Sequence, residues 1–147
     1  MTHIKLSQKI KNNIYRHARK LYPKECCGFL IGYLINNTLV CEDIKICKNI
    51  ADDPYNYFEI DPKDIIYIHK KYRNTKLSII GHYHSHPKDL LNSLPSQKDI
   101  DSIYDSNLCW LILGINSMQV EYSAYVPKFI KENTYNFKRI NTRTKKI

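Results

Sequence analysis

The sequence has few of the features that mark several large classes of protein. None of its apolar runs approaches the ~18–20 residues that a membrane-spanning helix requires. Residues 1–5 lack the apolar block of a secretory signal peptide. The sequence contains no internal repeat and no linker, and its 147 residues suit the length of one domain. We therefore expect a single cytoplasmic domain over residues 1–147, without membrane contact.

Cysteine is present, but without the spacing that would give it an obvious task. The chain has no C-x-x-C pair, and no serine or cysteine has the flanking glycines of a nucleophile elbow. We expect reduced, mostly buried thiols instead of disulfides or a cysteine-based zinc site. These expectations apply to Cys26, Cys27, Cys41, Cys47 and Cys109.

Arginine is sparse, although the net charge of +9 at pH 7 is high. Lysine greatly outnumbers arginine, which is the better residue for bidentate contacts to phosphate and guanine. Isoleucine, asparagine and tyrosine are abundant while alanine and glycine are scarce, a skew typical of AT-rich codons. We therefore expect no nucleic-acid partner, and the charge is equally compatible with steering toward an acidic protein.

The order of apolar patterns predicts an α/β fold, with a mixed sheet and helices against it. Helices are expected over about residues 6–21, with Ser7 as a cap, and from Asp61 to about residue 73. A third is expected from Ser96 to about residue 104. The basic end, about residues 141–147, is expected to fray. The expected strands cover residues 25–34, 38–46, 76–86, 109–115 and 119–126, with weaker candidates at 57–60 and 135–140.

The most informative stretch is Gly81–Pro87, which contains His84 and His86. Residues two apart project from the same face of a strand, so the two imidazoles can act together. Asp99 lies on the first turn of the following helix and can complete a set of three ligands. Two nitrogens and one oxygen leave a fourth tetrahedral position open, as in catalytic zinc sites.

A purely structural role remains open for several of these residues. A histidine in an apolar strand is often only a packed core residue; His82 is expected to pack but is the one competitor for the metal. Glu25 stands alone at the mouth of a buried strand, where it is either a proton-transferring base or a solvated edge residue. Ser96 either caps its helix or also stabilises an oxyanion. Ser85 faces the other way and is not expected to be a nucleophile.

Together these motifs resemble the signature of the JAMM (MPN-plus) metalloprotease family, in its short prokaryotic branch. The likeness covers about residues 6–126, although the loop between His86 and Ser96 is longer than usual in that family. It implies a JAMM-type domain with a mixed curved sheet flanked by helices, layered as in cytidine deaminases. The motifs that carry the resemblance are Glu25 ahead of Cys26-Cys27-Gly28, His84-Ser85-His86-Pro87, and Ser96-x-x-Asp99.

The resemblance also implies a function. His84, His86 and Asp99 would hold one Zn²⁺ per chain, Glu25 would be the general acid/base, and Ser96 would stabilise the oxyanion. The substrate would be a peptide or isopeptide bond after the Gly-Gly tail of a ubiquitin-like or sulfur-carrier protein. Two alternatives stay open: a zinc amidase acting on small or cell-wall peptides, and a non-catalytic protein-binding module on the same scaffold.

Overall fold

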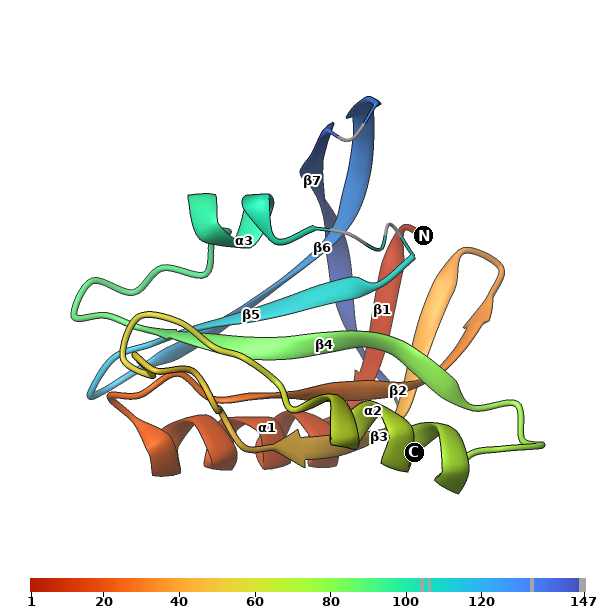
Figure 1. Ribbon diagram of the computed structural model, residues 1–147, viewed down its shortest axis with the longest axis horizontal. Helices are drawn as coiled ribbons and strands as arrows, with labels where there is room; N and C mark the ends of the chain where they lie inside the picture. The colour runs from red at the N-terminus through yellow and green to blue at the C-terminus, as the bar shows by residue number, and fades with distance from the viewer. Residues whose placement is uncertain (104, 106, 133, 146–147) are drawn as a thin grey trace.

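In the computed structural model helices are interspersed among strands in the first two thirds of the chain, and the last three described elements are strands, as Figure 1 shows. The structure describes residues 1–103, 105, 107–132 and 134–145. Its helices are α1 (Gln8–Leu21), α2 (Pro62–Lys71) and α3 (Gln97–Asp101). Its strands are β1 (His3–Ser7), β2 (Cys27–Ile35), β3 (Thr38–Cys47), β4 (Ser78–Pro87), β5 (Cys109–Ile115), β6 (Val120–Lys131) and β7 (Thr134–Lys145).

The strands form a closed barrel in the order β1-β3-β2-β4-β5-β6-β7. Most neighbours are antiparallel, but β4 runs parallel to β5, and β1 runs parallel to both β3 and β7. The short strand β1 closes the barrel because it pairs with β3 on one side and with residues 141–145 of β7 on the other. The prediction of a mixed sheet is confirmed. The sequence led us to expect a curved sheet, whereas the structure has a closed barrel. The deaminase-like layering stays a prediction.

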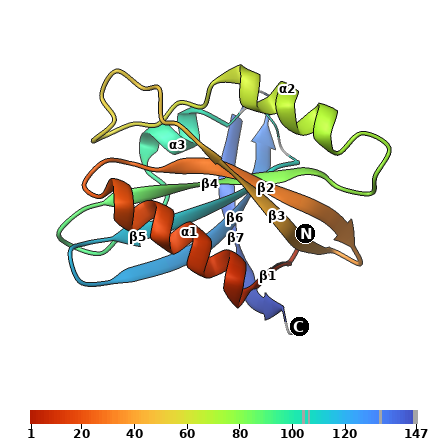
Figure 2. The same cartoon turned by 90° about the horizontal axis from the view of Figure 1, so that it is seen from below.

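Helices pack against both faces of the strands. One face of the sheet forms the main core with α1, whose Ile10, Ile14 and Ala18 are buried against it. The other face carries α2, which contributes Ile68, and the long segment between β3 and α2 (Figure 2). Gly28 on β2 shows how tightly β4 packs, because a Cβ at this position would lie 2.4 Å from the ring of Tyr83. β4 therefore lies in the middle of the sheet with packed layers on both sides.

Several expected elements are confirmed and others are corrected. Ser7 caps α1 and Asp61 caps α2, each through a side-chain oxygen that accepts a backbone N–H. Residues 57–60 do not form a strand; they contribute one isolated bridge between Ile60 and Asn49. The expected frayed end is wrong for residues 141–145, which pair with β1, while 146–147 lie outside the described residues. Among the described helices, none has the length and hydrophobicity needed to span a membrane.

Candidate metal centre and active-site cleft

Strand β4 delivers both histidines to one face of the sheet. His84 and His86 point away from α1, whereas the intervening Ser85 is fully buried on the other face. There the hydroxyl of Ser85 accepts a hydrogen bond from the backbone N–H of Cys26 at 2.8 Å. This arrangement follows from the two-residue period of a strand. The prediction that Ser85 faces away from the two histidines is confirmed.

The side chains of His84, His86 and Asp99 converge on one point. The Nε2 atoms of the two histidines lie 3.0 Å apart. Asp99 Oδ1 lies 3.3 Å from His84 Nε2, and Asp99 Oδ2 lies 3.1 Å from His86 Nε2. Among the residues that the structure describes, this is the group of histidine, cysteine and acidic side chains able to hold a metal ion.

The donor set and its spacing fit zinc. A tetrahedral zinc ion with bonds of about 2.0–2.1 Å holds its ligand atoms about 3.3 Å apart. The two Nε2 atoms lie 3.0 Å apart, and each lies 3.1–3.3 Å from one of the two carboxylate oxygens of Asp99, which is close to that value. Burial lowers the pKa of His84, which favours the neutral imidazole that a metal requires. Burial alone would raise the pKa of Asp99, but hydrogen bonds from His84 and His86 outweigh it and hold the carboxyl in its ionised form.

Aromatic rings surround the buried histidines. Phe58 stacks on the ring of His84 at 4.3 Å between centroids, and Trp110 contacts it edge-on. His82, two residues earlier on β4, packs as expected, with 4.3 Å between the centroids of its ring and that of Trp110. It is not part of the group formed by His84, His86 and Asp99. Burial lowers the pKa of His82 to about 3, so its imidazole is neutral. These rings orient His84 and exclude water from its inner side.

Glu25 lies in the same cleft, directly before β2. Its backbone N–H donates to Pro54 O at 2.7 Å, and its carbonyl accepts a hydrogen bond from Asn49 Nδ2 at 3.0 Å. Burial, and next the nearby Asp99 carboxylate, raise the pKa of Glu25 to about 8, while Lys88 opposes this rise. The side chain is therefore a buried carboxyl group that can both hold and release a proton near neutral pH, which contradicts the alternative of a solvated edge residue.

Ser96 and Asp99 are joined by a capping box at the start of α3. Ser96 Oγ accepts from the backbone N–H of Asp99 at 3.1 Å, and Asp99 Oδ2 accepts from the backbone N–H of Ser96 at 2.8 Å. The same Oδ2 faces His86, so the helix cap also fixes the rotamer of Asp99, the acidic candidate ligand. Ser96 is exposed to the cleft, and its hydroxyl hydrogen is not used by the cap.

The loop between β4 and α3 is held down at Ser93, which is buried. The backbone N–H and the hydroxyl of Ser93 each donate to Glu121 Oε1 at 3.0 Å. Tyr125 on β6 donates its hydroxyl to Ser93 O at 3.0 Å. Gly114 on β5 lets the loop lie close, because a Cβ there would come within 2.7 Å of the Asn92 backbone. We call these contacts the loop anchor; they position Ser96 and Asp99.

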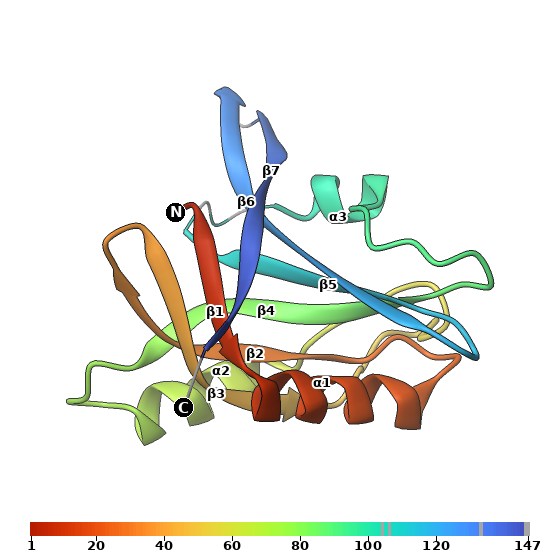
Figure 3. The same cartoon turned by 180° about the vertical axis from the view of Figure 1, so that it is seen from behind.

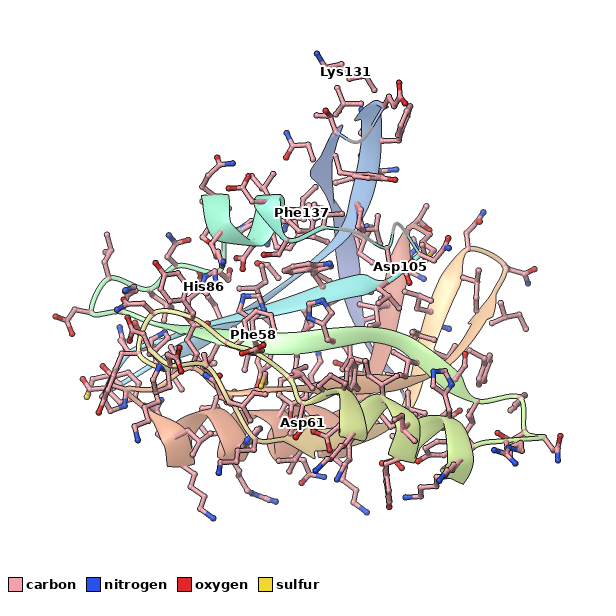
Figure 4. All side chains as sticks on the ribbon, in the orientation of Figure 1. Phe58, Asp61, His86, Asp105, Lys131 and Phe137 are labelled. Carbon is pink, nitrogen blue, oxygen red and sulfur yellow. The ribbon has the colours of Figure 1, made fainter. Side chains whose placement is uncertain are left out.

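All these groups open into one cleft of about 900 Å³. Its lining is mainly apolar and includes Phe58 and Trp110, with Lys88 and Lys98 among its charged residues. Figure 4 shows His86 and Phe58 on the side of the sheet where α3 lies. A cleft of this size that is apolar with a few convergent polar groups is typical of a binding site for a ligand or peptide.

The structure brings together all five residues singled out from the sequence, since Glu25, Ser96, His86 and Asp99 line the cleft and His84 lies directly beneath. Sequence reasoning missed the supporting residues. No role was predicted for Asn49, whose side chain joins the backbone of Glu25 to that of Tyr57. Ser93 and Phe58 were missed because only long-range contacts identify them.

Comparison with known proteins gives a consistent result. Residues 7–126 match the family model of prokaryotic homologs of the JAB domain. A desampylase of Pyrococcus furiosus is 28% identical over 102 residues, which cover 69% of this chain and 66% of the relative. A desampylase of Haloferax volcanii is 28% identical over 100 residues, covering 65% of this chain and 69% of the relative. Tail tip assembly protein K of Escherichia phage N15 is 29% identical over 109 residues, covering 74% of this chain but only 40% of the relative.

Two solved structures share the fold. A protein from Desulfitobacterium hafniense has a TM-score of 0.77 at 24% identity, covering 97% of this chain and 94% of its own. A protein from Salinibacter ruber has a TM-score of 0.67 at 20% identity, covering 99% of this chain and 92% of its own. At these identities the likeness concerns the fold alone. Figure 3 shows, from behind, the arrangement that they share almost from end to end.

Proposed function

The chain belongs to the family of prokaryotic homologs of the JAB domain, and on this basis we propose that it is a zinc-dependent hydrolase. It would cleave a peptide or isopeptide bond after the Gly-Gly tail of a ubiquitin-like or sulfur-carrier protein. The observation that carries the proposal is the convergence of His84, His86 and Asp99 beside the buried carboxyl group of Glu25 in one cleft. Structural zinc sites are closed by four protein ligands, whereas three ligands in a cleft are typical of catalysis.

The surroundings of each residue indicate its role in the proposed reaction. When bound, zinc supplies a Lewis acid and makes water a nucleophile near neutral pH. Glu25 takes a proton at its carboxylate and passes it to the leaving amine, a task that its raised pKa suits. Ser96 directs its free hydroxyl hydrogen to the substrate carbonyl oxygen as negative charge develops there. Phe58 and Trp110 exclude water, which strengthens these charge interactions.

The substrate class is supported by the relatives and not by the cleft alone. The two desampylases carry a name that describes removal of a ubiquitin-like modifier. The chain spans about two thirds of their length and less than half of the phage protein. An apolar cleft beside the candidate centre suits an extended tail, because a glycine tail gains main-chain hydrogen bonds in that form.

The test combines metal analysis with cleavage. Purified protein is expected to bind about one zinc per chain and to release a reporter from a Gly-Gly carrier fusion, with activity lost in chelator and restored by zinc. Free Gly-Gly peptides in parallel identify a zinc amidase if they are cleaved as fast as the fusion. Zinc far below one per chain, together with activity that chelator does not change, contradicts the proposal.

A further inference from the structure

A two-stranded ribbon extends from the barrel beyond the part of the chain that matches the family. It consists of residues 127–131 of β6 and 134–138 of β7, and the matched region ends at residue 126. In Figure 1 this ribbon rises from the barrel beside α3, and α3 contacts β7. The barrel closes below it through Ile140, which is buried in the main core. The distal part of the ribbon contributes little to that core, so packing of the main core does not explain why its side chains are aromatic.

One face of the ribbon is aromatic. Phe129 pairs with Tyr135 and Pro127 pairs with Phe137 across the two strands, so these four side chains share a face. The rings of Phe129 and Tyr135 lie 5.9 Å apart in an edge-to-face arrangement. Phe129 is nevertheless 61% exposed. An exposed phenylalanine held in a cross-strand pair forms a rigid apolar contact surface.

The aromatic face continues into the cleft. Phe137 packs edge-on against Trp110 with 5.0 Å between ring centroids, and Trp110 lines the cleft beside the candidate metal centre. Figure 4 shows Phe137 at the base of the ribbon, on the side of His86 and Phe58. A molecule whose tail lies in the cleft would therefore meet the ribbon with its body.

The charge at the cleft, where the aromatic face ends, indicates the chemistry of that body. The ribbon's own lysines, Lys128, Lys131 and Lys138, occupy the alternate positions of the two strands and project from the face opposite the aromatic pairs. The positive charge beside the aromatic face is that of Lys88 and Lys98, which line the cleft. Aromatic contacts flanked by charges of one sign are typical of protein-binding surfaces, in which the aromatics give affinity and the charges steer the partner.

We propose that the aromatic face of the ribbon is the docking surface for the folded body of the carrier protein whose tail enters the cleft. The partner presents an apolar patch flanked by acidic side chains next to its tail. This inference rests on the proposed function, because the tail must reach the metal centre while the body contacts Phe129 and Tyr135. It adds a second contact, separate from the cleft, that distinguishes a folded carrier from a free peptide.

The experiment compares two substrates that share one tail. One is a ubiquitin-like modifier of Pyrococcus furiosus fused through Gly-Gly to a reporter peptide, and the other is its last residues alone with the same reporter. In Phe129→Ser, KM for the folded fusion is expected to rise about tenfold, with kcat and the cleavage of the short peptide unchanged. Ile130→Ser is the matched control, since Ile130 is the adjacent residue and is 52% exposed but lies outside the aromatic pairs. Leu34→Ser, at the far β2–β3 hairpin, is the distant control.

The possible results separate failure of the docking inference from failure of the proposed function. If Phe129→Ser and Ile130→Ser have equal effects on the folded fusion, the ribbon is not the docking surface and the proposed function still stands. If the wild type cleaves the short peptide as fast and with the same KM as the folded fusion, the ribbon is not the docking surface and the enzyme is the zinc amidase. If neither substrate is cleaved by zinc-loaded protein, the proposed function fails and the docking inference fails with it. A tenfold change in KM confined to Phe129→Ser and to the folded fusion, weakening further at high salt, supports the inference.

Discussion

The two halves of the candidate site are held in place by different means. His84 and His86 belong to β4, a strand paired on both sides and packed above and below, so their positions follow from the barrel itself. Asp99 lies in a five-residue helix that Ser96 caps and that the chain reaches through a loop, and a few hydrogen bonds at Ser93 tie that loop to β6. The strand half is therefore expected to survive the loss of the metal, whereas the loop half depends on local contacts and on the metal.

Removing one ligand from each half gives the largest contrast. His84→Ala and Asp99→Asn are both expected to weaken zinc binding by more than about 100-fold. This is more than the loss expected when a residue that only supports a ligand is replaced. In metal-free protein only His84→Ala should lower the free energy of unfolding, by about 2–4 kcal/mol, because it leaves a cavity in a fully buried layer. Zinc titration and urea unfolding in chelator measure the two effects. Equal destabilisation by both variants would contradict the distinction between the halves.

Glu25→Gln separates catalysis from metal binding. The amide keeps the shape of the side chain but cannot take a proton, so zinc content is expected to stay at the wild-type level while kcat falls about 10²–10⁴-fold. Glu59→Gln is the matched control, since Glu59 also lines the cleft but is exposed. The measurements are zinc stoichiometry and turnover of a Gly-Gly fusion. Turnover equal to that of the wild type would show that Glu25 is not the base.

Ser96 has two tasks in the loop half, and two substitutions separate them. Ser96→Gly removes the hydroxyl but weakens a helix cap by only a few tenths of a kcal/mol. We expect its kcat to fall about 10²-fold or more because the oxyanion loses a donor. Ser96→Thr keeps the hydroxyl and should retain most of the activity. If Ser96→Gly loses stability and zinc affinity but not kcat, the hydroxyl serves only as the cap.

The raised pKa of Glu25 leads to a smaller predicted effect, on the pH dependence of stability. Because burial raises this pKa from 4.5 to about 8, folded metal-free protein keeps the proton over a range in which the unfolded chain has released it. The free energy of unfolding should therefore fall by up to about 1.4 kcal/mol per pH unit between these two values as pH rises. Glu25→Gln should remove that part of the slope. Unfolding curves in chelator at several pH values test this, and parallel profiles for the two proteins would contradict it.

The smallest expected effect concerns the loop anchor. Tyr125→Phe removes the hydrogen bond to Ser93 O, worth about 1 kcal/mol, and should weaken zinc binding about tenfold through Asp99. Tyr122→Phe is a matched control, because Tyr122 lies on the same strand and donates its hydroxyl to Lys11 O, away from the site. Zinc affinities of the two variants are compared with their unfolding temperatures. Equal zinc affinities would mean that the anchor does not position Asp99.

Much of the site could be predicted because its information is local. The two-residue period of a strand places His84 and His86 on one face, and a Ser-x-x-Asp pattern at a helix start builds a capping box. The residues that hold these parts in place could not be predicted in the same way. Glu121 and Tyr125 follow Ser93 by 28 and 32 positions, and nothing in the sequence between them indicates that they meet.

The sequence by itself determined the candidate ligands, the candidate base and the family resemblance, since these depend on residue type and short spacing. Only the tertiary structure decided that the sheet closes, because β1 and the end of β7 come from opposite ends of the chain. It also decided that Glu25 is buried next to Asp99, which raises its pKa, and that an aromatic ribbon continues the cleft. Burial and long-range pairing are properties of the packed molecule, and local sequence patterns do not contain them.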